Sequence, residues 1–298
     1  MTNLLRKRNL LPGLIATLIL SSVVLFIFFG SLLKNPNETF FANDHDGLQN
    51  YYGHIFHIKY DSSYLHTTGM NYPYGEMIYY TGVQLVPANI IKFISDHIID
   101  LSGYVIGLQN LGMLFSIVIA AVFLFLIFAE MKVRKLFASI SAVSIAFLSP
   151  QLDRFGGHFS LTISFFVPLI IYLILKFSQT KRLYLSLIIG FVFFWSYTTH
   201  PYFFAINAAL VLFFWIFTYS KDISQWRKYT YHLFLQLILP YLVVQFFSLL
   251  LIRLPTVLRL HGVFYFTELI LKVYFYPLVA IWSVLSWIFL KPIILQWE

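Results

Sequence analysis

The sequence has no cysteine and little charge, since only 11% of its 298 residues are Asp, Glu, Lys or Arg. Without cysteine, neither a disulfide framework nor a thiolate metal site can form. Soluble domains carry about 25% charged residues, and a soluble fold could not bury a chain that is 59% hydrophobic behind so little polar surface. These shortages exclude an ordinary soluble domain. They predict a polytopic membrane protein whose first partner is the lipid bilayer.

Long apolar runs are what the sequence has instead. A helix needs about 20 apolar residues to cross a bilayer core of about 30 Å. The sequence therefore predicts an all-α transmembrane helix bundle with about seven spans, at residues 10–33, 104–128, 136–152, 159–175, 183–199, 202–219 and 233–252.

The chain 1–298 is then a single module. A first span at 10–33 leads into a loop at 34–103, and six further spans lie within 104–252. The tail at 253–298 is extracytoplasmic or interfacial, and its apolar part at 273–290 is either an eighth span or a surface segment.

The apolar run from residue 183 to residue 219 is interrupted only by His200-Pro201. As one helix it would extend about 55 Å, nearly twice the hydrocarbon thickness. Proline disfavours helical backbone at the residue before it. We therefore expect the chain to turn back at His200.

The placement of charge predicts the orientation. With the N-terminus in the cytoplasm, 12 of the 20 basic residues but only 2 of the 12 acids fall on the cytoplasmic side. This agrees with the positive-inside rule, so the net charge of +8 reports topology and we expect no nucleic-acid partner. The loop at 34–103 then faces the extracytoplasmic side. None of the seven predicted spans contains Asp, Glu, Lys, Arg or His, which argues against an ion-coupled transporter.

Two acids follow the first span. Asp44 and Asp46 are two residues apart, with Gly47 directly after them. Two close carboxylates suit a general base or the ligand set of a divalent cation such as Mg or Mn. The alternative is an acidic N-terminal cap on a helix that begins near Gly47.

Two further clusters lie on the predicted outer face. Tyr74 and Glu76 belong to a Tyr-Pro-Tyr-Gly-Glu turn, which forms either a wall of a substrate pocket or an interfacial anchor. Arg154 and His158 lie in a short turn between spans, where a guanidinium suits a phosphate or pyrophosphate. The alternative there is a surface pair between Asp153 and Arg154.

Three stretches resemble a known family: residues 43–52 (NDHDGLQNYY), 70–76 (MNYPYGE) and 156–161 (GGHFSL). They are similar to bacterial multi-span glycosyltransferases of the GT-C superfamily, and more narrowly to the YfhO-related membrane proteins of Bacteroidetes. The resemblance covers essentially the whole chain. It implies a GT-C-like bundle in the bacterial inner (plasma) membrane with an extracytoplasmic active face. Because relatives continue into further spans, we expect the chain to be an N-terminal piece of a longer protein.

The resemblance implies inverting transfer of a sugar from a polyprenyl-phosphate donor to an envelope glycan, lipid or protein. Asp44 or Asp46 would take the acceptor proton, and Arg154 with His158 would neutralise the leaving phosphate. A divalent cation could share that work. Relatives carry another acid where this chain has residues 81–83 (TGV), so the pattern departs there. The alternative is a non-catalytic membrane protein for envelope assembly or lipid binding, or a transporter.

Overall fold

The computed structural model describes residues 10–221 and 224–252, so the tail at 253–298 lies outside the described residues. The described part is helical apart from one two-stranded sheet. Its elements are α1 (Leu11–Lys34), α2 (His45–Lys59), β1 (His66–Thr67), β2 (Glu76–Met77), η1 (Ile78–Thr81), α3 (Leu85–His97), η2 (Ser102–Tyr104), α4 (Val105–Glu130), α5 (Lys135–Phe147), η3 (Pro150–Gly156), η4 (Phe159–Thr162), α6 (Phe166–Thr180), α7 (Leu183–Thr199), α8 (Pro201–Lys221), α9 (Trp226–Leu233), the π-helical η5 (Phe234–Ile238) and α10 (Leu239–Ile252).

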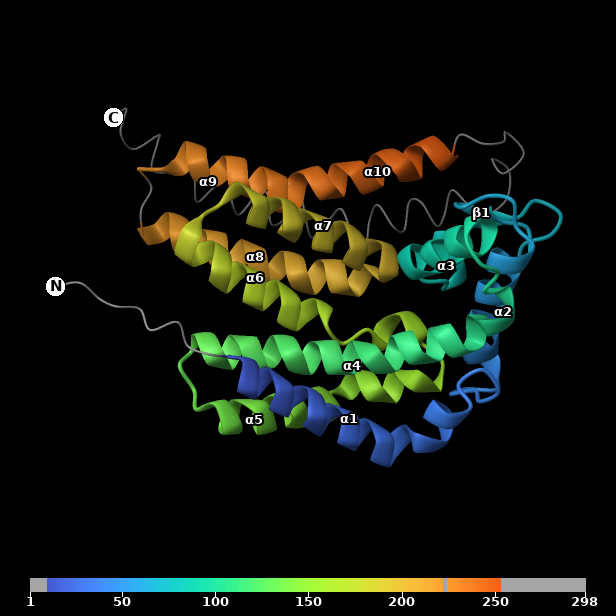
Figure 1. The fold of residues 1–298 in the computed structure, drawn as a ribbon. Coiled ribbons are helices and arrows are strands. Elements are labelled where there is room, and N and C mark those ends of the chain that lie inside the picture. Colours follow the sequence, from blue (N-terminus) through green and yellow to red (C-terminus); the bar gives the residue numbers. More distant parts are fainter. Residues whose placement is uncertain (1–9, 222–223, 253–298) are drawn as a thin grey trace. The chain divides into compact units, whose positions relative to one another are not determined.

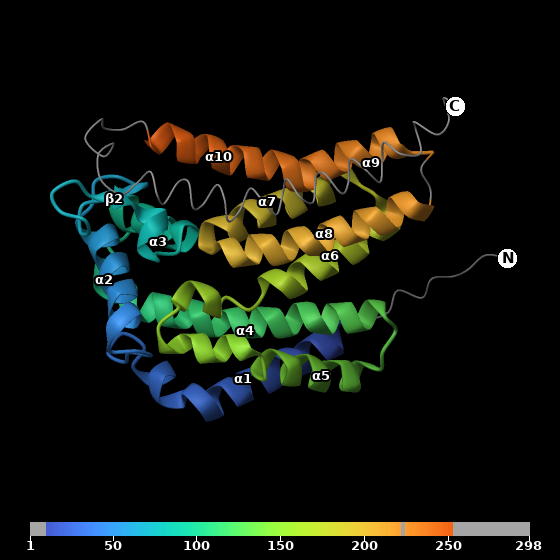
Figure 2. The ribbon, with the colours of Figure 1, turned by 180° about the vertical axis from the view of Figure 1, so that it is seen from behind.

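The apolar helices form two groups, which Figure 1 shows from one side and Figure 2 from behind. Helices α1, α4 and α5 pack on one another, and α6, α7 and α8 form a second group that meets the first through α4 and α6. Small residues bring the first group together: Ala138 and Ala142 of α5 pack on Phe125 of α4, and the Ser139 hydroxyl donates to the Gly13 carbonyl at 3.0 Å. Close approach over small side chains is typical of helices that pack in lipid.

The prediction of a helical bundle that suits a bilayer is confirmed in its coarse form. Within residues 10–221 and 224–252, four helical segments are long and apolar enough to cross a membrane: Leu11–Lys34, Ser102–Glu130, Lys135–Gly156 and Pro201–Lys221. The helices Phe166–Thr180 and Leu183–Thr199 are apolar but shorter. Large apolar side chains cover the outer surfaces of the apolar helices. Phe28 of α1 and Phe213 of α8, for example, are 72% and 70% exposed. Such surfaces are compatible with contact to lipid chains.

The predicted turn at His200 is confirmed. Helix α7 ends at Thr199 and α8 begins at Pro201, and the two helices pack against each other. Between them His200 is extended, with φ −162° and ψ 133°. This is the backbone region that the residue before a proline prefers.

The predicted spans at 136–152 and 159–175 have different bounds in the structure. Helix α5 ends at Phe147, because Ser149 precedes Pro150 and takes an extended conformation with ψ 133°. The chain then runs through the 3-10 turns η3 and η4 before α6 begins at Phe166. Apolar composition alone did not separate these turns from helix.

Residues 34–103, which the sequence predicted as a loop with a helix near Gly47 as one alternative, form an ordered layer that we name the cap. Figure 1 shows α2, α3 and the hairpin together at one end of the helices. Strands β1 and β2 pair antiparallel, with His66 opposite Met77 and Thr67 opposite Glu76. Helices α2 and α3 pack on each other, so the cap has a core of its own.

A buried polar cluster supports that core. His57 Nδ1 faces Asp61 Oδ2 at 3.2 Å, and His57 Nε2 faces Asn89 Oδ1 at 2.9 Å. The Asn89 amide donates to the Tyr64 carbonyl at 2.8 Å. The Lys92 ammonium donates to the Asp61 carbonyl at 2.6 Å and completes the cluster.

One buried amide anchors the cap to α4. Tyr51 of α2 donates to Asn110 Oδ1 at 2.5 Å, and Asn110 Nδ2 donates to the carbonyls of Pro36 and Thr39 at 2.8 and 2.7 Å. Asn110 is fully buried. Its neighbour Gln109 is also buried, yet its amide makes no hydrogen bond to any described residue.

The two neighbouring amides provide a matched test of this anchor. Asn110→Ala leaves a hydroxyl and two carbonyls without their partner, so we expect it to lower the free energy of unfolding by at least about 3 kcal/mol. Gln109→Ala removes an amide that the described fold does not use, so its effect should stay below about 1 kcal/mol. Thermal unfolding of both variants in detergent measures the difference. Equal losses would show that Asn110 is not the anchor.

Candidate functional site

Helix α2 begins where the sequence placed the acidic pair. Asp44 is its N-cap residue, with φ −137° and ψ 171°, and Asp46 lies in the first turn. The helix predicted near Gly47 therefore starts at His45. The Asp44 side chain makes no capping hydrogen bond to the backbone. The helix dipole favours a carboxylate in the first turn. Asp46 therefore stabilises α2 whether or not it also binds a ligand.

The structure brings Asp46 to the predicted phosphate-binding turn. Asp46 Oδ2 lies 3.7 Å from His158 Nδ1, and both side chains are exposed. The Asn50 amide fixes this approach, because it donates to the Asp46 carbonyl at 2.7 Å and to the Gly157 carbonyl at 2.9 Å. Gly157 has φ +149°, a conformation that favours glycine. Two segments more than a hundred residues apart therefore meet at one place.

His200 joins the same place from the turn between α7 and α8. Burial, together with the nearby charge of His158, lowers the pKa of His200 to about 4. Its Nδ1 accepts a hydrogen bond from the Tyr202 backbone N–H at 3.2 Å. The sequence marked His200 only as a turn residue. No local sequence pattern could predict that His200 lies near His158, because the two histidines belong to different connections between helices.

Arg154 lies one turn before His158. The Arg154 carbonyl accepts from the backbone N–H of His158 at 2.9 Å, and the Arg154 side chain is exposed. The alternative pairing with Asp153 does not form: among residues 10–221 and 224–252, no acid lies within ion-pair distance of this guanidinium. An uncommitted guanidinium beside a histidine suits an anion such as a phosphate.

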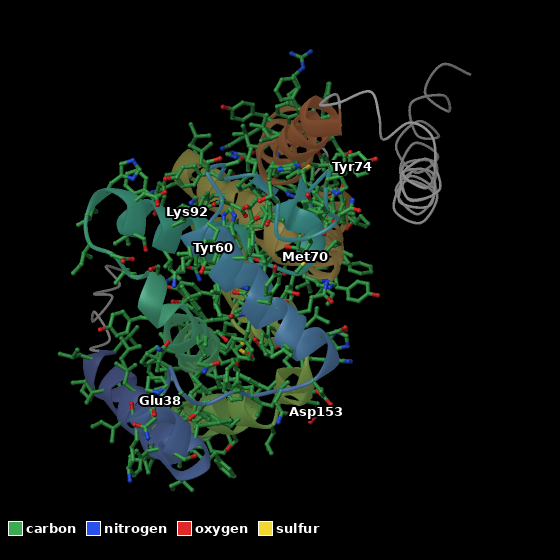
Figure 3. All side chains as sticks on the ribbon, turned by 90° about the vertical axis from the view of Figure 1, so that its right-hand side faces the viewer. Glu38, Tyr60, Met70, Tyr74, Lys92 and Asp153 are labelled. Atoms are coloured by element: carbon green, nitrogen blue, oxygen red, sulfur yellow. The ribbon has the colours of Figure 1, made fainter. Side chains whose placement is uncertain are left out.

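An open pocket of about 600 Å³ adjoins the first two turns of α2. Its lining residues are Leu48, Gln49, Tyr52, Met70, Asn71 and Glu76. Burial raises the pKa of the Glu76 carboxyl, and the charge of His66 opposes that shift. Figure 3 looks onto the end of the helices that carries the cap. In this view Lys92 lies on one side of Tyr60, and Met70 and Tyr74 lie on the other. Of the two residues predicted to bind substrate, Glu76 lines the pocket, whereas Tyr74 is exposed beside it.

The predicted divalent-cation site at Asp44 and Asp46 stays a prediction. Within the described ranges, no group of three or more His, Asp or Glu side chains is placed to hold a metal ion. Oxygen donors from one or two carboxylates fit Mg, which often completes its coordination with water and substrate phosphates. The donor chemistry of the pair is therefore suitable.

One family model covers the cap, the histidine cluster and most of the apolar helices. The match spans residues 18–288, and the family is described as Domain of unknown function (DUF6311). The chain belongs to the DUF6311 family. No curated protein and no solved structure matches the chain. The matched residues of this DUF6311 chain include every candidate site residue, from Asp44 to His200.

Acid should loosen the cap of this DUF6311 protein through His54. His54 is buried, faces the Asn50 carbonyl through Nδ1 at 2.8 Å, and accepts from the Gln84 N–H through Nε2 at 3.3 Å. Burial lowers its pKa from 6.5 to about 4. The unfolded chain therefore binds the extra proton, and stability falls as pH falls through this window, by up to about 1.4 kcal/mol per pH unit.

The measurement is the melting temperature of the wild type and of His54→Gln between pH 7.5 and 5. We expect the wild type to lose more stability on acidification than His54→Gln, which cannot titrate. His97→Gln, at an exposed histidine of α3, is the control and should follow the wild type. The same acid sensitivity in all three proteins would contradict the assignment to His54.

Proposed function

We propose that this chain is a membrane glycosyltransferase that moves a sugar from a polyprenyl-phosphate donor to an acceptor hydroxyl at the extracytoplasmic face of the bacterial inner membrane. The observation that supports it most is the meeting of Asp46 with His158, with the uncommitted guanidinium of Arg154 one turn away. Transfer from a phosphate-linked donor requires a base and an anion-binding group in one site, and these two segments supply both.

The ends of the helices support the placement of this site. The cap and the turns at His158 and His200 lie at one end, whereas the connections from α4 to α5 and from α6 to α7 lie at the other (Figure 1). Those other connections carry Lys132, Arg134, Lys135, Lys181 and Arg182. The positive-inside rule assigns the basic end to the cytoplasm. With α9, η5 and α10 as a continuous helix, the scheme has seven spans within 10–252.

The reaction is a single displacement. The acceptor oxygen forms a bond to the anomeric carbon on the face opposite the phosphate, and the bond from that carbon to the phosphate oxygen breaks, so the configuration inverts. Asp46 takes the hydroxyl proton, and Asp44 is the alternative base. The electron pair leaves with the polyprenyl phosphate, whose negative charge Arg154 stabilises with two parallel N–H donors. His158, whose Nδ1 lies 3.7 Å from Asp46 Oδ2, orients the Asp46 carboxylate.

His200 has a positioning role in this scheme. It is held neutral at pH 7, because burial and the charge of His158 lower its pKa to about 4. A neutral His200 ring adds no further positive charge to the site. If a Mg or Mn ion binds, it neutralises phosphate charge, and Asp44 and Asp46 are the residues that would hold it.

The base assignment predicts a large loss of activity in one variant. Asp46→Asn keeps the side-chain shape and lies outside the apolar helices, so the protein should insert normally. We expect transfer to fall by about 100- to 10,000-fold, the usual contribution of a general base. The measurement is release of labelled sugar from a panel of radiolabelled polyprenyl-phosphate sugars by protein in proteoliposomes.

Asp153→Asn is the matched control. Asp153 is an exposed acid in the neighbouring turn η3 and forms no ion pair with a described residue. It should keep wild-type transfer. Wild-type activity in a well-inserted Asp46→Asn variant would make the assignment wrong. A wild-type protein that releases sugar from no donor would favour the non-catalytic alternative.

A further inference from the structure

The pocket beside α2 has walls of a distinct chemical kind. Two amides, Gln49 and Asn71, and one carboxyl, Glu76, share it with the Tyr52 ring and the apolar side chains of Leu48 and Met70. No lining residue is basic, so the pocket does not suit a phosphate. Its volume of about 600 Å³ falls within the range of small-molecule sites, about 300–1,000 Å³.

The polar groups of this pocket are not used by the fold. Among the residues that the structure describes, the Gln49 side chain makes only one hydrogen bond, a weak one from Nε2 to Met70 Sδ at 3.9 Å. The side chains of Asn71 and Glu76 make no hydrogen bond to residues that the structure describes. By contrast, the amides of Asn50, Asn89 and Asn110 hold the cap together. Polar groups without a structural duty are available to a ligand.

The walls are also held in place without a ligand. The Tyr52 hydroxyl donates to the Gly69 carbonyl at 3.1 Å, which ties α2 to the segment that carries Met70 and Asn71. Gly69 packs so closely on Phe56 that a Cβ there would overlap the ring. Glu76 is fixed by β2, opposite Thr67 of β1. A pre-formed site loses less entropy when a ligand binds.

We propose that this pocket binds one pyranose ring of a carbohydrate acceptor. The two amides and the Glu76 carboxylate would receive the ring hydroxyls, and the Tyr52 ring with Leu48 and Met70 would cover the apolar C–H face. This chemistry fits a neutral molecule that is rich in hydroxyls on one edge and apolar on its face.

The position of the pocket supports the acceptor over the donor. Gln49 follows Asp46 by three residues, so it lies one helical turn, about 4.5 Å, further along α2. A ring bound beside Gln49 can direct a hydroxyl toward the Asp46 carboxylate. The anion-binding group, Arg154, belongs to the turn η3, no residue of which lines the pocket. This inference rests on the proposed function, because it identifies the substrate class of the same site.

Saturation-transfer difference NMR tests the pocket without any donor. The protein is placed in lipid nanodiscs, because maltoside detergents would compete with the probes. The probes are methyl β-D-glucopyranoside, methyl α-D-mannopyranoside, methyl β-D-galactopyranoside and N-acetylglucosamine. We expect at least one probe to receive saturation, and we expect Glu76→Gln and Asn71→Ala to weaken its binding at least tenfold.

Tyr72→Ala is the control, since Tyr72 is next to Asn71 in sequence, 89% exposed and not part of the lining. It should bind the probe as the wild type does. No saturation of any probe, or equal binding by wild type, Glu76→Gln and Asn71→Ala, overturns the proposal. Asp46→Asn separates the two claims: it should bind the probe normally while transfer is lost. Probe binding by a protein that transfers no sugar would contradict the proposed function and leave the pocket standing.

Discussion

The distribution of charged residues in this molecule follows from one constraint, the exclusion of charge from an apolar environment. Moving an unpaired ionised group out of water is very unfavourable, and none of the seven predicted spans contains Asp, Glu, Lys, Arg or His. Charged side chains therefore collect where the helices end. Among the described residues, the connections at one end carry Lys132, Arg134, Lys135, Lys181 and Arg182, whereas the cap at the other end carries most of the acids and histidines. The candidate site lies at that second end.

The cap must satisfy its own polar groups, and it does so with a few buried amides. Asn110 receives Tyr51 and holds the carbonyls of Pro36 and Thr39, while Asn50 joins the start of α2 to the Gly157 turn. Because these amides already form hydrogen bonds within the protein, they position the site and do not bind a ligand. Four other polar side chains form no comparable hydrogen bonds with the described residues: Arg154, Gln49, Asn71 and Glu76. These are the groups that remain available to bind a ligand.

Local sequence patterns were enough for several helix boundaries and insufficient for the site. The bounds of α7, the turn at His200 and the start of α2 near Gly47 followed from apolar length, proline and capping chemistry. The meeting of Asp46 with His158 depends on contacts across 107 residues of sequence, between Asn50 and Gly157. No periodicity reports such a contact. For the same reason the fold of residues 34–103 was missed, since its hairpin and its buried polar cluster around His57 depend on tertiary packing.

The sidedness of the membrane is the claim on which the proposed chemistry depends most directly, and a chain without cysteine allows a clean measurement of it. Tyr72→Cys places a thiol on the cap, and Met131→Cys places one at the connection after α4; the two native side chains are 89% and 64% exposed. In intact spheroplasts, an impermeant maleimide should label position 72 at once and position 131 only after lysis. Labelling of position 131 with protection of position 72 would place the candidate site in the cytoplasm and contradict the account.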